Sequence, residues 1–149
     1  MSQPPTKPEE LALEVVERFC NKFKDNETQR SFRSRARTMI TDLYVNGTAY
    51  VISMCAARSS AEAVELGLTA PRLDDLLEEV RKNSLARQEP GYAIYGAVLL
   101  YALRQLGVLE NCRTLGDALR ELMDNHFADR KAYYFASWLK RFTEAYIHE

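Results

Sequence analysis

The segment RSFRSRARTMIT, residues 30–41, concentrates arginines and hydroxyl-bearing side chains at helical spacing. At about 100° of rotation per residue, its apolar residues fall on one side of a helix and its polar donors on the other. Phosphate oxygens accept hydrogen bonds from guanidinium and hydroxyl groups, and one arginine can hold a phosphate through two bonds. The alternative is an ordinary solvated face with arginines extended over apolar neighbours. The polar face consists of Arg30, Arg33, Ser34, Arg37, Thr38 and Thr41.

The C-terminal segment, residues 130–147, predicts a second helix that carries cations. Its Lys140 and Arg141 fall outside the apolar stripe, and so does Tyr133. An exposed tyrosine beside cations can stack on a base or anchor a protein interface. The apolar stripe is mostly aromatic, and aromatic residues at helical spacing are expected in the core. It consists of Phe135, Trp138, Leu139, Phe142 and Tyr146.

The residue types that an enzyme active site requires are scarce. The chain has two histidines, His126 and His148, and no CxxC pair, HxxxH pair or glycine-rich phosphate loop. Carboxylates one helical turn apart can hold a divalent cation, but here a solvated acidic face is expected. These carboxylates belong to Asp74, Asp75, Glu78 and Glu79. We therefore expect no catalytic residues, no metal site, no cofactor and no small-molecule substrate.

Charge is distributed unevenly along the chain, although the net charge is only -1. From Arg18 to Arg37, seven cations and two anions give a net charge of +5. From Glu62 to Glu79, one cation and six anions give -5. A molecule with a basic face and an acidic face can stack head to tail, or dock between an acidic protein and a polyanion.

The stretch LYVNGTAYVISM, residues 43–54, decides the fold class. Asn-Gly between apolar runs is a hairpin signal, but the apolar residues on both sides recur every three or four positions. We therefore predict two helices joined at Gly47, with this residue at positive φ. One continuous helix containing Gly47 is the alternative. Because the rest of the chain also has helical periodicity, we predict an all-α bundle of about six to eight helices.

Several residues mark the expected helix boundaries. Helix stops are predicted at Gly67 and Gly107, and residues 88–91 are expected to break the chain between two helices. Residues 92–106 have almost no polar side chain and predict a central buried helix. The helix that follows Thr114 is expected to end near residue 125, and the last helix is expected to span residues 130–147. The expected N-terminal caps are Thr6, Ser59, Thr69, Thr114 and Asp129.

The whole chain fits one domain, with residues 1–8 as a flexible tail and 9–149 as the helical domain. No signal peptide is recognised, and the longest uncharged run, residues 91–103, is too short to span a bilayer. The scattered cysteines Cys20, Cys55 and Cys112 are typical of reduced cytosolic thiols, so a cytoplasmic protein is expected.

Two segments resemble a known family. FRSRARTMITDLYVNGTAYVISMCAAR, residues 32–58, and YYFASWLKRFTEAYI, residues 133–147, resemble the small subunit of type III-B (Cmr) CRISPR effector complexes, the fifth Cmr subunit family. The shared pattern is a basic segment, an apolar helical turn, Asn-Gly, a second apolar helix with a basic end, and a C-terminal Trp-Leu-Lys-Arg-Phe run. The family more often has an apolar residue where this chain has Thr48.

The resemblance implies an all-α, non-catalytic protein of prokaryotic antiviral defence. Its expected partners are the other Cmr subunits, further copies of itself, and the duplex of guide and target RNA, with no membrane partner. Copies would stack along the guide-RNA backbone, and RNA cleavage belongs to another subunit. RNA phosphates are then expected at the polar face of residues 30–41, at Lys140 and Arg141, and at Arg58. A helical adaptor without a nucleic-acid role is the alternative.

Overall fold

The structure of the protein, a computed structural model, describes residues 7–84 and 89–148. These residues form eight helices and no strand, which confirms the predicted all-α fold. No helix among them combines the length and the apolar character needed to cross a membrane. The helices are α1 (Pro8–Lys22), α2 (Asn26–Asn46), α3 (Thr48–Arg58), α4 (Ala61–Thr69), α5 (Leu73–Ser84), α6 (Gly91–Gln105), α7 (Leu115–Leu122) and α8 (His126–Tyr146).

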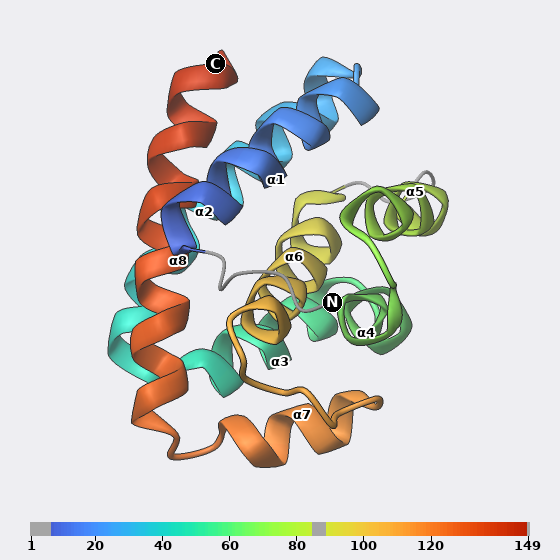
Figure 1. Ribbon diagram of the computed structural model, residues 1–149. Helices are drawn as coiled ribbons and strands as arrows, with labels where there is room; N and C mark the ends of the chain where they lie inside the picture. The colour runs from blue at the N-terminus through green and yellow to red at the C-terminus, as the bar shows by residue number, and fades with distance from the viewer. Residues whose placement is uncertain (1–6, 85–88, 149) are drawn as a thin grey trace.

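Helix α6 lies in the middle of the bundle, as its sequence predicted (Figure 1). Every residue from Gly91 to Leu103 is buried. Helices α1, α2 and α8 cover one side of α6, while α3, α4 and α5 cover the other. A helix that is apolar all round is stable in water only when neighbours surround it, so α6 determines where the other helices pack.

The residues of α4 continue past the predicted stop at Gly67, and that prediction was wrong. The helix ends at Thr69, and Gly67 lies inside it against α6. A Cβ atom at position 67 would lie 2.2 Å from the carbonyl oxygen of Ala97. The glycine therefore serves the close contact between two helices and does not end one of them.

The corner at Asn46-Gly47-Thr48 separates α2 from α3, which confirms the two-helix interpretation. Gly47 has φ 88° and ψ 171°, so its φ is positive as predicted, but its ψ is more extended than in a left-handed turn. This region is accessible almost only to glycine. The N–H group of Gly47 donates to the carbonyl oxygen of Leu43 at 3.0 Å and closes α2.

Two of the predicted boundary residues act as expected. The hydroxyl of Thr114 accepts a hydrogen bond from the N–H of Asp117 and caps α7, although that helix ends at Leu122, before the predicted residue 125. Gly107, at φ 89°, ends α6, and the N–H of Val108 donates back to the carbonyl of Leu103 at 2.9 Å. The N–H of Gly107 also donates to the carbonyl of Arg104 at 3.2 Å, and the two bonds together form a Schellman stop.

Two other predicted caps, Ser59 and Thr69, were wrong. Ser60 caps α4, while the Ser59 hydroxyl donates to the carbonyl of Cys55. Thr69 is the last residue of α4, and α5 begins only at Leu73. Helix α1 begins at Pro8 after Lys7, whose side chain makes no capping bond; the predicted cap Thr6 lies outside the described residues, as do Gln88 and most of the predicted tail.

Asp129 was predicted to cap α8 but caps α3 instead. Asn125 caps α8, four residues earlier than expected, and its side chain accepts from the N–H of Ala128. The Asp129 carboxylate accepts from both the N–H and the hydroxyl of Thr48, at 2.9 and 2.6 Å. A side chain of the last helix therefore holds the corner between α2 and α3.

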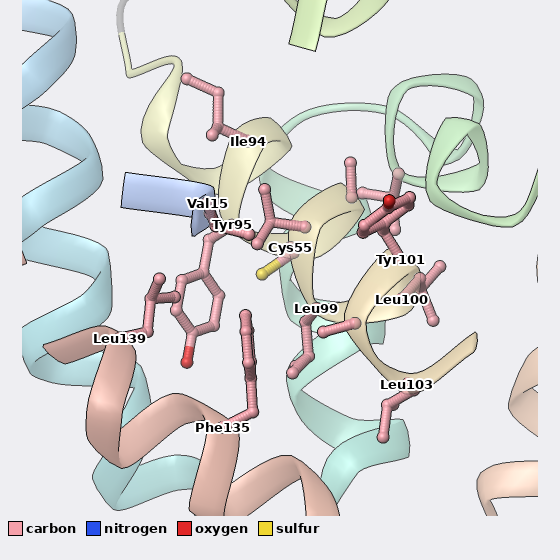
Figure 2. Close-up of a cluster of buried hydrophobic side chains, with 14 of the residues drawn as sticks. Val15, Cys55, Ile94, Tyr95, Leu99, Leu100, Tyr101, Leu103, Phe135 and Leu139 are labelled. Carbon is pink, nitrogen blue, oxygen red and sulfur yellow. The ribbon is translucent and has the colours of Figure 1, made fainter. Parts of the chain in front are cut away.

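Within the described residues, one hydroxyl group deep in the core has no hydrogen-bond partner. Tyr95 of α6 is fully buried, and its hydroxyl has no partner within the described structure. Its ring points toward α8, between Leu139 and Phe135 (Figure 2). Burial raises the pKa of Tyr95 above its ordinary value, so this hydroxyl stays protonated. Nearby, burial also raises the pKa of the Cys55 thiol to about 12.

Replacing Gly47 with valine should lower the free energy of unfolding by about 1–3 kcal/mol, because a β-branched residue is strained at this φ and ψ. The new Cβ would also lie 3.2 Å from the Asp129 carboxylate. Chemical denaturation measures the change. Gly116→Ala in α7 is the matched control and should leave stability unchanged or raise it by up to about 1 kcal/mol. Equal stability of G47V and the wild type would contradict the positive-φ corner.

Replacing Tyr95 with phenylalanine should raise the free energy of unfolding by about 1 kcal/mol, because it removes a buried hydroxyl without a partner. Thermal and chemical denaturation test this. Tyr92→Phe provides the contrast, since its buried hydroxyl accepts a hydrogen bond from Arg35 and its removal should destabilise the protein. Destabilisation of Y95F by a similar amount would show that the Tyr95 hydroxyl has a partner.

Candidate nucleic-acid interface

Helices α2 and α8 lie side by side and run in opposite directions (Figure 1). Helix α2 buries Phe32, Ala36, Met39 and Leu43, four residues at helical spacing. On α8 the buried positions include the small residues Ala128, Ala132 and Ala136. Short side chains allow a close approach of the helix axes, so polar residues beside this seam come together at the surface.

A groove of about 310 Å³ follows the seam between the two helices. It brings together Thr41 of α2 with Lys140 and Arg141 of α8, which were predicted separately as phosphate ligands. The Arg141 side chain is exposed and has a weak ion pair with Glu144 at 3.4 Å. The groove is lined by Ile40, Thr41, Tyr44, Tyr133, Ser137, Lys140 and Arg141.

Two tyrosines stand at one end of this groove. The ring centroids of Tyr44 and Tyr133 are 5.7 Å apart, and Tyr44 is 77% exposed. Tyr133 was expected outside the core and is half-buried. Tyr44 is exposed because consecutive residues point about 100° apart on a helix and Leu43 already occupies the buried position. Exposed rings beside cations can stack on bases.

The remaining α2 candidates differ in accessibility. Arg30 and Arg37 are exposed and lie on the same side of the helix as Thr41, while Arg33 is half-buried. The exposed Thr38 donates its hydroxyl to the carbonyl of Ser34 at 2.9 Å. Its hydroxyl proton is therefore used within the helix. The Ser34 hydroxyl, half-buried, accepts from Arg35 at 3.0 Å.

Arg58 does not join the groove. Its guanidinium lies 5.6 Å from the ring centroid of Tyr92, at the start of α6. Arg35 approaches the same ring to 4.5 Å and also donates to the Tyr92 hydroxyl. The sequence counts Arg35 with the other basic residues of α2, but the structure uses it to join α2 to α6.

The basic and acidic segments meet inside one molecule, which the sequence did not predict. Arg18 of α1 bonds to Asp74 of α5 at 2.6 Å. Further acidic residues of α5 pair locally, and the hydrogen bond from Arg81 lowers the pKa of the Glu78 carboxyl. Much of the expected acidic face is thus already paired. Within the described residues, no three His, Cys, Asp or Glu side chains are arranged to hold a metal ion.

The prediction of a core stripe on α8 was correct for Phe135 and Leu139, which are buried. It was wrong for Trp138 and Tyr146, which are 43% and 46% exposed. Helix α8 turns the side bearing Phe135 and Leu139 toward its neighbours, and Trp138 lies too far round the helix to share that contact.

No protein-family model matches the chain, and neither a curated protein nor a solved structure does.

Proposed function

We propose that the chain is a non-catalytic RNA-binding small subunit of an RNA-guided complex of the type III-B CRISPR kind. The observation that supports this most directly is the α2–α8 groove, where Thr41, Lys140 and Arg141 lie beside two tyrosines. Both helices of the groove come from the segments that resemble the family.

The groove has the donors and surfaces that an RNA backbone needs. Lys140 and Arg141 offer charged donors to phosphate oxygens, and Thr41 adds a hydroxyl at the surface. Arg30 and Arg37 extend the positive charge along the same side of α2. Such contacts recognise the charge and shape of RNA, while pairing between guide and target supplies the sequence specificity.

The contacts within one copy are few, so several copies along one RNA would bind far more tightly than one copy alone. Each cation that reaches a phosphate releases counterions, and copies fixed on the same strand act at a high effective concentration. The partners that we propose are the guide–target RNA duplex, further copies of the chain, and the other subunits of the complex.

A helical adaptor without an RNA role is the second candidate function. It is favoured by the exposed aromatic residues Phe127, Tyr134 and Trp138 on α8. The salt dependence of RNA binding separates the two candidates, because phosphate contacts weaken steeply as salt rises.

Replacing Lys140 and Arg141 together with alanine should reduce the salt dependence of RNA binding. Each lost phosphate contact lowers the slope of log affinity against log salt by roughly 0.7–0.9, so the pair should lower it by about 1.5. The measurement is fluorescence anisotropy of a labelled 20-base-pair RNA duplex between 50 and 200 mM salt. Arg113→Ala with Arg120→Ala removes the same charge from an exposed region elsewhere and is the control. If both double variants had equal slopes, RNA would not bind in the groove.

Affinity purification of the tagged chain from its native cell should recover CRISPR backbone subunits together with short guide RNAs. Mass spectrometry identifies the proteins, and sequencing identifies the RNA. A matched strain with an untagged chain controls for background. Recovery of other proteins without guide RNA would refute the small-subunit assignment and favour the adaptor.

A further inference from the structure

The solvent-facing side of α8 carries a row of residues separated alternately by four and three positions. We name this row the outer stripe; it consists of Phe127, Lys131, Tyr134, Trp138, Arg141 and Ala145. Phe127 is 63% exposed, Tyr134 55% and Trp138 43%. The stripe lies on the side of α8 that faces away from the core residues of the same helix.

The outer stripe exposes three aromatic side chains along one helix. Helix α8 stands along one side of the bundle, where α1 and α2 cover its inner faces only (Figure 1). An aromatic side chain has about 200 Å² of surface, so the three exposed fractions leave roughly 300 Å² of ring in water. This area is in the range of the largest apolar patch on a monomeric protein, and that patch is often functional.

The spacing of the stripe fits a partner helix. Alternating steps of four and three residues keep a row of side chains on one line along an α-helix, as in helix pairs that cross at a shallow angle. Tyrosine, tryptophan and arginine are also the residue types that contribute most to protein interfaces.

The cations on and beside the stripe outnumber the carboxylates. Arg130 is exposed next to it, and Arg141 and Lys131 lie within it. The Lys131 ammonium lies 4.8 Å from the ring centroid of Phe127 and also donates to the Leu106 carbonyl. The stripe itself has no carboxylate, and Glu144 reaches Arg141 from the side. A complementary partner therefore carries carboxylates.

A second copy of α8 does not fit this charge pattern. If two outer stripes paired in opposite directions around their midpoint, Lys131 of one copy would face Arg141 of the other. If they paired in the same direction, each cation would face itself. Both arrangements place like charges opposite one another, which is unfavourable at an interface.

We propose that the outer stripe docks an acidic amphipathic helix of another protein. Leucine, isoleucine or methionine side chains of that helix pack against Phe127, Tyr134 and Trp138. Its aspartates or glutamates, placed beside this apolar row, pair with Arg130 and Arg141. This inference goes beyond RNA binding and does not depend on it, because the partner is different and the two contact surfaces share only Arg141.

Trp138 is the only tryptophan in the chain, so its fluorescence reports directly on the stripe. The probe is a 21-residue helical peptide with leucines at the same four-and-three spacing and glutamates beside them; a second peptide has lysine in place of each glutamate. With the full chain, the glutamate peptide should shift Trp138 emission to shorter wavelength and saturate. The lysine peptide should bind at least tenfold more weakly.

Charge reversal sharpens the test. Arg130→Glu with Arg141→Glu should reverse the preference, whereas Lys24→Glu with Arg113→Glu, at exposed positions elsewhere, should preserve it. Lys131 is left unchanged because it holds the end of α6. Absence of a shift with the glutamate peptide, or a preference that survives reversal at Arg130 and Arg141, would overturn the proposal.

Two further probes identify a different occupant. These probes are an oligouridine RNA and vesicles of phosphatidylcholine and phosphatidylglycerol. If one of them shifts Trp138 emission and the glutamate peptide does not, the stripe binds nucleic acid or membrane, and the proposal is overturned. Failure of RNA binding in the groove leaves the peptide result unchanged, so the two functions fail separately.

Discussion

The bundle depends on one constraint, which is that α6 has no polar face. Because every residue from Gly91 to Leu103 is buried, water must be excluded from all sides of this helix. Each amphipathic neighbour can cover only part of its circumference, so several short helices are required. Gly67 shows how tightly they pack, since a single methyl group there would collide with the backbone of α6. The unpartnered Tyr95 hydroxyl is a cost of the same burial.

Many short helices create many helix ends, and every end leaves backbone groups without partners inside the helix. The chain satisfies several of these with side chains from distant segments. Ser31 accepts from the N–H of Gly91, Glu65 from that of Leu115, and Asp129 from that of Thr48. Arg104 donates to the carbonyls of Leu68 and Ala70 at the end of α4. These bonds join one helix to the end of another, so they fix the arrangement of helices as well as their lengths.

This mode of capping explains which features could be predicted from the sequence. Periodicity alone identified the helices and the central position of α6, and local signals located the corner at Gly47 and the stop at Gly107. Asp129 could not be assigned correctly, because its partner Thr48 is 81 positions away in sequence. Gly67 was predicted to end a helix because glycine is common at helix ends, and only its contact with Ala97 shows its packing role.

The candidate site shows a similar division. Thr41, Lys140 and Arg141 were each predicted from local pattern, but their common groove depends on the packing of α2 against α8. The exposure of Tyr44 could be predicted from its position directly after Leu43. The exposure of Trp138 could not, because it depends on which side of α8 packs against its neighbours. Helix α8 therefore has three roles around its circumference: a buried face, a groove beside α2, and the outer stripe. Arg141 belongs to both the groove and the stripe, so a carboxylate bound there would compete with a phosphate for the same guanidinium. Any coupling between the two surfaces would act through this residue, and it would be reciprocal.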